Sequence, residues 1–403
     1  MRVLLISLGF PKYVGDSTAP FMASIVRSLV ARDHVVDVVL PHHPDFHYPV
    51  EVGFQFFPYR YSPTERLSPW GFGGSLDGSS RVNRQTAAFL PAVVFSLRRC
   101  LSGLLATHRY DVVHAHWLLP NAWVAKNRSR RAGVPLVVTL HGTDVAMAER
   151  KRFLRRLAGQ TLSAAGAVTA VSDDLRRRAE RLGADPSKIR TVHLGVDTEA
   201  FAPRELDPAA RSRLGVPADA FHVVTVGRLI EVKGFRYLIE AVSRLEGVHL
   251  TIVGDGDLRS ELEQLAKTLH ASVTFAGNLD QPAVADAVAA ADVVAVPSVV
   301  GRAGSVDGLP TTLLEALAAG RAVIASAVAG IPEVVTNGVN GVLLPEKDVD
   351  ALARALTELR DQPELRERLG REARRRAVAE LDWNATAQAF EQAYIAAGAR
   401  RPY

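Results

Sequence analysis

Short hydrophobic runs alternate with amphipathic stretches along the whole chain. Runs rich in β-branched and aliphatic residues predict strands, whereas apolar residues spaced three and four apart predict helices. In the first half the predicted strands are Arg2–Leu8, Val35–Leu40, Val112–His116, Leu136–Leu140, Ala167–Ala170 and Lys188–Val192. After a proline-containing stretch the pattern restarts, with predicted strands His222–Val226, His249–Val253, Val273–Ala276, Val293–Val296, Ala322–Ala325 and Gly341–Leu344.

These strands are apolar on both faces, and helical patterns such as Phe235–Leu245, Leu258–His270 and Thr312–Ala319 separate most of them. Such alternation is typical of parallel sheets that helices cover on both sides. We therefore expect an α/β protein with two doubly wound, Rossmann-like domains, residues 1–195 and 196–383. Ligands of such domains bind at the carboxyl ends of the strands.

Two segments fall outside this pattern. The stretch Tyr59–Arg84 is polar, aromatic and glycine-rich without a clear period, which predicts a long functional loop on the first domain. The last helical stretch, Trp383–Ala397, can pack on either domain, and a return to the first domain over residues 384–403 is one of the two arrangements.

Composition supports an ordinary globular protein, because 48% of the 403 residues are hydrophobic and 23% are charged. No apolar run of about 18 residues is evident, so no membrane-spanning segment is predicted. The segment Met1–Phe10 has the pattern of a strand and not of a secretory signal. The single cysteine, Cys100, excludes an intramolecular disulfide and a cysteine-rich zinc site. Together these features predict a cytoplasmic protein.

Charge is distributed unevenly between the two halves. Residues 1–195 contain 26 Lys and Arg against 14 Asp and Glu, whereas the remainder contains 22 against 29. One interpretation is an anionic partner of the first half, such as the inner face of a membrane; the other is solvated helix faces in an arginine-rich chain. Nucleic acid is not predicted, because the basic runs lack interleaved aromatic residues. The basic clusters are Arg128, Arg130 and Arg131; Arg150, Lys151, Arg152, Arg155 and Arg156; and Arg176, Arg177 and Arg178.

A first candidate site follows the strand His222–Val226, where Gly227 and Arg228 lead to Lys233 at the start of a helix. A helix N-terminus offers free N–H groups and partial positive charge, and two cations beside it suit a diphosphate. The alternative is a surface Arg and Lys flanking a turn.

A second candidate site is the stretch Asp307–Glu315, which follows the strand Val293–Val296. Gly308 and Pro310 shape a turn, and a helix begins near Thr312. Carboxylates suit sugar hydroxyls because they accept two hydrogen bonds at once. The alternatives are a turn residue at Asp307 and a capping box formed by Thr312 and Glu315.

Polar residues also follow strands of the first domain. His141, Gly142, Thr143 and Asp144 come after one strand, and His114, His116 and Trp117 end another. The His-x-His spacing is compatible with metal binding, but no third ligand lies close in sequence. Packing is the more common role of such histidines.

Several stretches together identify the chain as a member of the retaining glycosyltransferases of family 4, which have the GT-B fold of two Rossmann-like domains facing each other across a cleft. The resemblance covers nearly the whole chain, in this order: DVVHAHWLLP (111–120), VTLHGTD (138–144), VGRLIEVKG (226–234), IVGDGDLRSELE (252–263), FAGNL (275–279), ADVVAVPS (291–298) and DGLPTTLLEALAAGRAVIAS (307–326).

The resemblance implies a role for each candidate residue. Arg228 and Lys233 would bind the donor diphosphate, Asp307 the donor sugar and Glu315 the ribose. The donor would also meet Gly227, backbone N–H groups of the Gly308–Thr312 turn, and, near the base, Asn278 and Leu279. His141 would steady the transition state, and His116 and Trp117 would serve the acceptor side. Asp144, also on the acceptor side, would orient either the neighbouring loop or the acceptor. The residues of that turn are Gly308, Leu309, Pro310, Thr311 and Thr312.

The sequence departs from the family at two places. The family usually has Glu at the position of Asp307, so the contact to the donor sugar is open. The loop after the first strand, which in the family lies close to the donor phosphate or the acceptor, has Gly15 alone where the family often has two glycines. Gly15 would still bind the donor through its backbone.

The implied reaction transfers a sugar from a nucleotide sugar, with UDP favoured and GDP next, to a hydroxyl of a lipid-linked, polysaccharide or small-molecule acceptor. It would proceed on one face of the sugar, without a cofactor or a metal. Asp255-Gly-Asp257 is expected to be a turn and not a metal site. The alternatives are a GT-B-fold sugar-nucleotide 2-epimerase and a non-catalytic, two-lobed nucleotide-sugar-binding protein.

Overall fold

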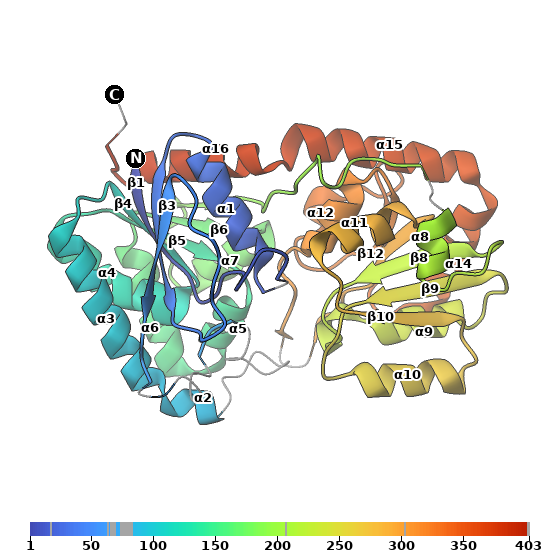
Figure 1. The fold of residues 1–403 in the computed structure, drawn as a ribbon, viewed down its shortest axis with the longest axis horizontal. Coiled ribbons are helices and arrows are strands. Elements are labelled where there is room, and N and C mark those ends of the chain that lie inside the picture. The colour runs from blue at the N-terminus through green and yellow to red at the C-terminus, as the bar shows by residue number, and fades with distance from the viewer. Residues whose placement is uncertain are drawn as a thin grey trace. The chain divides into compact units, whose positions relative to one another are not determined.

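Two parallel sheets organise the chain in the computed structural model (Figure 1). The structure describes residues 1–16, 18–62, 64, 70–72, 84–205, 208–301 and 304–400. One unit comprises Met1–Leu194 and the segment from Trp383 onward, and the other comprises Gly195–Asp382. Most of the predicted loop 59–84 lies outside the described residues.

The sheet of the first unit has seven strands in the order β3-β2-β1-β4-β5-β6-β7, and every neighbouring pair is parallel. The strand that the sequence pattern does not predict is β3, an edge strand in which Phe56 and Phe57 are only partly buried and two other residues are exposed. The strands are β1 (Arg2–Ile6), β2 (Val35–Pro41), β3 (Phe54–Tyr59), β4 (Val112–His116), β5 (Leu136–Leu140), β6 (Ala167–Ala170) and β7 (Ile189–Thr191).

Helices cover both faces of this sheet. The crossovers through α1 and α4 run in opposite directions from the centre of the sheet, so right-handed connections place them on opposite faces. Helix α16 contacts α1 and β6, and on the other face α4 contacts both α3 and α6. The helices are α1 (Pro20–Val30), α2 (Arg84–Ala88), α3 (Leu90–Thr107), η2 (Leu118–Ala122), α4 (Trp123–Ala132), α5 (Thr143–Arg150), α6 (Arg152–Ala164), α7 (Asp173–Arg181) and α16 (Trp383–Ala396).

Specific polar contacts hold α16 on the first unit. Glu391 receives two hydrogen bonds of 2.8 Å from the guanidinium of Arg32, and its other contact is the Nε2 atom of His34, also at 2.8 Å. The hydrogen bond from Arg32 is the main cause that lowers the pKa of Glu391. Of the two arrangements expected for the last helix, the structure has the return to the first unit.

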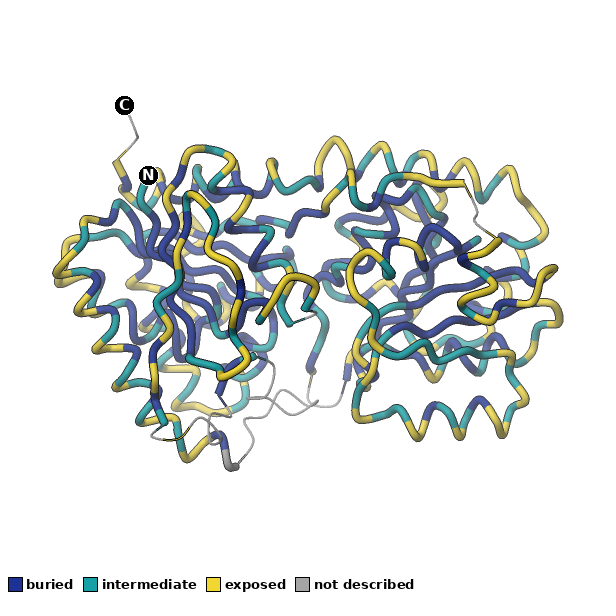
Figure 2. The backbone as a smooth tube through the Cα atoms, viewed as in Figure 1, coloured by how far each residue is buried: buried dark blue, intermediate teal, exposed yellow. Residues whose placement is uncertain are grey.

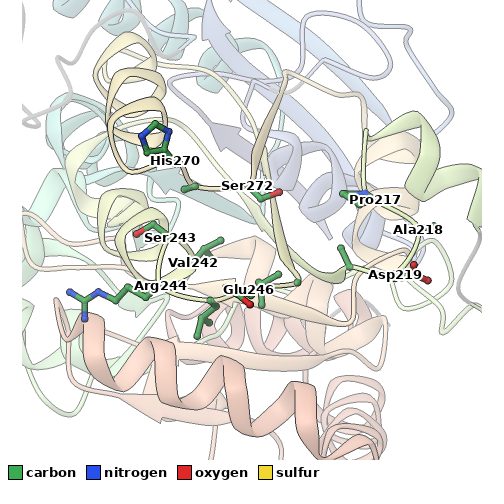
Figure 3. A pocket seen from close by; sticks show the side chains of 14 residues that line it. Pro217, Ala218, Asp219, Val242, Ser243, Arg244, Glu246, His270 and Ser272 are labelled. Carbon is green, nitrogen blue, oxygen red and sulfur yellow. The ribbon is translucent and has the colours of Figure 1, made fainter.

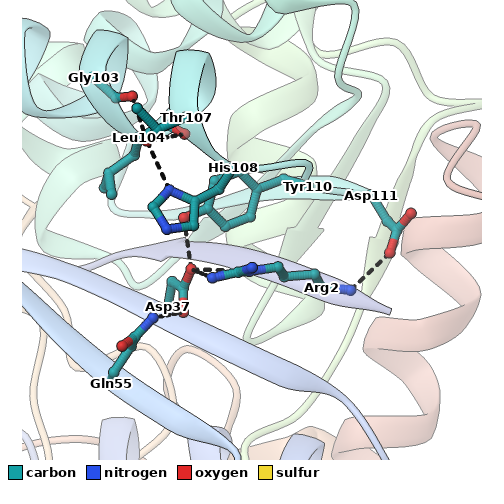
Figure 4. Close-up of polar contacts among 9 residues, drawn as sticks. All are labelled: Arg2, Asp37, Gln55, Gly103, Leu104, Thr107, His108, Tyr110 and Asp111. Atoms are coloured by element: carbon teal, nitrogen blue, oxygen red, sulfur yellow. Dashed lines mark hydrogen bonds and ion pairs between the residues drawn. The ribbon is translucent and has the colours of Figure 1, made fainter.

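A buried carboxylate, that of Asp37, connects residues near the starts of neighbouring strands through hydrogen bonds (Figure 4). Asp37 is fully buried and accepts hydrogen bonds from Arg2, Gln55 and the hydroxyl of Tyr110 at 2.6 Å. Because each partner comes from a different strand or strand end, this network fixes the register of β1, β2 and β3. It lies at the start of β1, away from the ends where ligands bind.

The sheet of the second unit has six parallel strands in the order β10-β9-β8-β11-β12-β13. Residues of β8, β9, α9 and α14 form its main apolar core, and Figure 2 shows the buried strands inside partly exposed helices. The strands are β8 (Phe221–Val226), β9 (Val248–Val253), β10 (Val273–Gly277), β11 (Val293–Val296), β12 (Ala322–Ser326) and β13 (Val342–Leu344). The helices are α8 (Pro208–Arg213), η3 (Glu231–Lys233), α9 (Phe235–Val242), α10 (Arg259–Thr268), α11 (Gln281–Ala289), α12 (Thr311–Ala318), α13 (Ile331–Val334), α14 (Val349–Asp361) and α15 (Pro363–Glu380).

By length and composition alone, one helix of the described chain, α3, could cross a membrane. Only 22% of the residues of this helix are buried in the protein. The buried residues Val93, Leu97, Leu101 and Leu104 form one stripe, which contributes to the core of the first unit. Arg98 and Arg99 interrupt the apolar character at the middle of the helix.

Candidate functional site

The first candidate site forms where β8 ends. Gly227 has φ 152°, and a Cβ atom there would lie 3.0 Å from the Cε atom of Lys233. Glycine therefore lets the lysine side chain lie across the backbone at the end of the strand. Gly234 has φ 67°, and a Cβ atom there would lie 1.9 Å from the carbonyl oxygen of Pro297. The turn before α9 is thus packed against the end of β11.

An ion pair joins the two sequence motifs. The Nζ atom of Lys233 lies 2.7 Å from the Oδ2 atom of Asp307, with 16% and 26% of the two side chains exposed. Lys233 follows β8 and Asp307 follows β11, the two neighbouring strands from which the sheet order diverges. In open α/β sheets this divergence point is where ligands bind. Both side chains are therefore partly buried and paired with each other.

The helix α12 begins at Thr311, with Pro310 as its N-cap residue and no side-chain cap. The hydroxyl of Thr312 donates instead to the carbonyl of Val226 at 3.2 Å, which joins α12 to the end of β8. The capping-box alternative for Thr312 and Glu315 is therefore wrong. Before the helix, the carbonyl of Gly308 accepts a hydrogen bond of 2.9 Å from the N–H of Gly330, and Leu309 is buried.

Glu315 lies near Lys233 on the first turns of α12. Burial raises the pKa of Glu315 to about 7, and the positive charge of Lys233 opposes this rise. Its carboxyl is surrounded by protein although part of the side chain remains exposed. A cation, a paired carboxylate and a carboxyl that titrates near neutral pH thus share one end of the sheet.

The other predicted donor residues lie around this cluster. Arg228 directly follows Gly227 and is exposed. Asn278 and Leu279 follow the edge strand β10, which β9 separates from β8. They therefore follow a strand two places from β8 in the sheet, whereas α12 follows β11, the direct neighbour of β8.

In the first unit, the candidate histidines form a hydrogen-bonded set. The Nδ1 atom of His116 lies 2.9 Å from the Nε2 atom of His141. His114 contacts the hydroxyls of Tyr394 at 2.8 Å and Thr139 at 2.6 Å. His114 and His116 are fully buried. His116 was expected on the acceptor side, but its side chain lies inside the first unit, where it hydrogen-bonds His141.

Burial keeps these imidazoles neutral, lowering the pKa of His114 and of His141 to about 3 and that of His116 well below its usual value. In the described chain the Nε2 atom of His116 has no hydrogen-bond partner. An unsatisfied acceptor costs less than an unsatisfied N–H donor, which favours a proton on Nδ1 of His116. His116 then donates to His141, and the proton of His141 stays on Nδ1, available to a ligand.

Aromatic rings surround His141. Its ring centroid lies 4.5 Å from that of Trp117 and 5.3 Å from that of Phe21. Trp117 is partly exposed and has φ 65°, a conformation that turns the chain sharply after β4. Gly15 lies with φ 92° in the loop between β1 and α1, where a Cβ atom would meet nothing within 4 Å.

Asp144 holds the loop around His141. Its buried carboxylate accepts hydrogen bonds from the backbone N–H groups of Leu118, His141, Gly142 and Val145. Burial raises the pKa of Asp144, and the four N–H groups oppose the rise because they favour the carboxylate. Asp144 therefore orients the loop, one of the two roles expected for it.

Replacing Asp144 with asparagine is expected to lower the free energy of unfolding by about 2 kcal/mol, because hydrogen bonds to a buried charge are lost. The side-chain NH₂ group of asparagine is itself a hydrogen-bond donor, so it would face backbone N–H groups that also need an acceptor. Urea unfolding of D144N and of D185N, which changes an exposed aspartate, would measure this effect. Equal losses in the two variants would contradict the orienting role.

Sequence reasoning missed the groups that complete this site. Phe21, Tyr394 and Thr139 come from α1, α16 and β5, far apart along the chain. The one available signal was the polar Thr139 inside the apolar strand LVVTL.

Within the described ranges, no group of three or more His, Cys, Asp or Glu is arranged to hold a metal ion. Asp255 accepts a hydrogen bond from the N–H of Gly256 in the turn before α10, as expected for a turn. A separate hollow of about 700 Å³ lies at the amino ends of β8, β9 and β10, lined by Asp219, Arg244 and His270 among others (Figure 3). It is at the opposite edge of the sheet from Lys233.

Two parallel α/β units with candidate sites at the carboxyl ends of their strands are the arrangement typical of the GT-B fold. Residues 19–200 match the family model "Glycosyltransferase Family 4", and residues 207–376 match "Glycosyl transferases group 1". The chain is 34% identical over 319 residues to D-inositol 3-phosphate glycosyltransferase of Thermomonospora curvata, covering 72% of each chain. It is also 34% identical over 310 residues to that of Kribbella flavida, covering 71% of each. The chain therefore belongs to glycosyltransferase family 4.

Solved structures show the same fold. Sucrose-phosphate synthase from Thermosynechococcus elongatus superposes with a TM-score of 0.79 at 22% identity, covering 98% of both chains. The Anabaena protein HepE in complex with UDP-glucose gives a TM-score of 0.70 at 21% identity, covering 97% of this chain and 98% of that one.

Proposed function

We propose that this glycosyltransferase moves a sugar from a nucleotide-diphosphate sugar, with UDP favoured and GDP next, to an acceptor hydroxyl with retention of anomeric configuration. The observation that carries the proposal is the Lys233–Asp307 pair at the divergence point of the second sheet, with Glu315 beside it. Cations neutralise the charge of a diphosphate, and carboxylates accept hydrogen bonds from the hydroxyls of the sugar and the ribose.

The charges suit transfer without a metal. Lys233 and Arg228 are proposed to hold the diphosphate and to stabilise the negative charge that grows as the glycosidic bond breaks. Backbone N–H groups at the start of α12 add partial positive charge. No cofactor is part of the proposal.

Asp307 and Glu315 are assigned to hydroxyl groups of the donor. Because Asp307 already bonds Lys233, the donor would meet an ion pair in which each partner is held in place by the other. Asp307 would contact a hydroxyl of the sugar, and Glu315 the ribose. A UDP-glucose complex of the structural neighbour HepE supports UDP as the first nucleotide to test.

The proposed step occurs on one face of the sugar. The bond from the anomeric carbon to the diphosphate oxygen breaks, the acceptor oxygen bonds the same face of that carbon, and its proton passes to the departing diphosphate. Retention by double displacement would instead need a carboxylate nucleophile beneath the sugar. His141 is the proposed contribution of the first unit, as a neutral N–H donor that stabilises charge.

The acceptor is proposed to be a hydroxyl compound, lipid-linked, polysaccharide or small. Relatives named D-inositol 3-phosphate glycosyltransferase make D-inositol 3-phosphate the first small acceptor to assay. A cytoplasmic location, where nucleotide sugars are made, is part of the same proposal.

A panel of nucleotide sugars is expected to raise the melting temperature, UDP-sugars most, since a ligand at 100 times its Kd stabilises by roughly 2.7 kcal/mol. Labelled donor then separates the alternatives. Transfer to an added acceptor supports the proposal, conversion of donor without acceptor indicates an epimerase, and binding without turnover indicates a binding protein. Activity is expected to survive EDTA, and strong inhibition by EDTA would overturn the metal-free assignment.

A further inference from the structure

Three neighbouring helices of the first unit contain no acidic residue. They are α3 (LPAVVFSLRRCLSGLLAT), α4 (WVAKNRSRRA) and α6 (RFLRRLAGQTLSA), with two, four and three basic residues respectively. Helix α4 contacts both of the others, so the three form one continuous layer on one face of the sheet. We name this layer the α3–α4–α6 face.

The cations of this face are crowded and lack carboxylate partners. Arg128 is desolvated and lies near Arg131 and Arg98, and these causes, in that order, lower its pKa. Within the described part of the chain, its guanidinium bonds the neutral hydroxyl of Ser102, at 3.3 Å. Among the described residues, no basic residue of these three helices forms an ion pair with Asp or Glu. Mutual repulsion of this kind is relieved when an anionic surface neutralises the charges.

An arginine-rich composition does not by itself explain this face. Other arginine-rich helices of the same chain alternate the two signs and pair them. On α7, Arg176 lies 2.9 Å from Asp173 and 2.7 Å from Glu180. On α15, Arg376 lies 3.4 Å from Glu380. Within the described residues, the arginine-rich helices α7 and α15 thus pair cations with carboxylates on the same helix, whereas the helices of the α3–α4–α6 face do not.

Exposed phenylalanines accompany the arginines. Phe95 on α3 is 68% exposed and precedes Arg98 and Arg99 by three and four positions, so all three share the exposed stripe of the helix. On α6, Phe153 is also 68% exposed and lies three positions before Arg156. An aromatic ring next to cations matches an anionic lipid surface, where the ring enters the interface and the cations meet phosphates.

From these observations we infer that the α3–α4–α6 face docks the protein on an anionic membrane surface. Helix α3 lies flat on that surface and does not span it, because its opposite stripe (Val93, Leu97, Leu101, Leu104) is buried in the first unit. This inference does not rest on the proposed donor or acceptor.

The test measures binding of the full chain to vesicles of phosphatidylcholine alone and of an equimolar mixture with phosphatidylglycerol. Binding is expected only to the anionic vesicles and is expected to weaken with salt. Each cation near such a surface contributes about 1 kcal/mol, roughly a five-fold change, so R98Q/R99Q should lower the partition coefficient by roughly 25-fold. The matched control R371Q/R375Q removes two exposed charges from α15 and should leave binding unchanged.

Fluorescence tests the orientation of the helices. Tryptophan at Phe95 or Phe153 should shift its emission to shorter wavelength with anionic vesicles, whereas tryptophan at Val52, which is 97% exposed, should not. Unchanged melting temperatures would show that each variant is folded. Absence of anionic-vesicle binding at low salt, equal losses in R371Q/R375Q, or tight binding to RNA with none to vesicles would each overturn the inference.

Discussion

Replacing Lys233 with alanine is expected to lower turnover by roughly 10²-fold or more, the usual effect of losing one preorganised charge at a reacting centre. Lys233 is held across Gly227 and bonded to Asp307, so its charge is fixed where a diphosphate would depart. Alanine at Arg228 is expected to act in the same direction. Initial rates with a labelled UDP-sugar measure the effect.

Arg236→Ala is the matched control, because Arg236 is an exposed cation three residues away that pairs with Glu240 and lies over the ring of Tyr237 on its own helix. Removing Lys233 also leaves Asp307 without its partner, and an unpaired carboxylate repels a diphosphate. K233A/D307N is therefore expected to bind UDP more tightly than K233A alone, a non-additive result. Turnover of K233A equal to that of R236A would remove Lys233 from the mechanism.

Most strands of the two sheets could be predicted from the sequence. Runs such as Val112–His116 and Val293–Val296 occur as strands with the predicted bounds, because a strand buried on both faces needs a continuous apolar run. Helix ends are less accurate. Leu258–His270 is shorter in the structure, Arg259–Thr268, since His270 adopts φ 51° and cannot continue the helix. The half-exposed edge strand β3 has no such run and was missed.

The candidate sites follow from the sequence only in part. The motif order places Lys233 and Asp307 at the ends of adjacent strands, but their 2.7 Å contact depends on backbone turns that the sequence does not specify. The support of His141 by His116, and of His114 by Tyr394 from the last helix, joins residues that are distant in sequence. The capping box considered for Thr312 is absent, because its hydroxyl donates to the carbonyl of Val226 at the end of β8 and does not cap its own helix.

Glu315→Gln is expected to stabilise the second unit at alkaline pH and to have no effect in acid. Burial raises the pKa of Glu315 from its ordinary value of 4.5 to about 7, so the folded state retains a proton that the unfolded state releases. Stability therefore falls as pH rises from about 4.5 to 7, by up to about 3 kcal/mol for a shift of this size. Glutamine is neutral at every pH and avoids this loss.

Melting temperatures of both proteins across this pH range test the expectation, with E367Q, which changes an exposed glutamate of α15, as the control. A difference that does not grow with pH, or one that E367Q shares, would contradict the titration of Glu315. If E315Q is more stable at pH 8 yet binds UDP more weakly, the two results have one cause. That cause would be a carboxylate retained in a buried position, at a cost in stability, for the ligand that it binds, because stabilising changes at ligand sites characteristically reduce function.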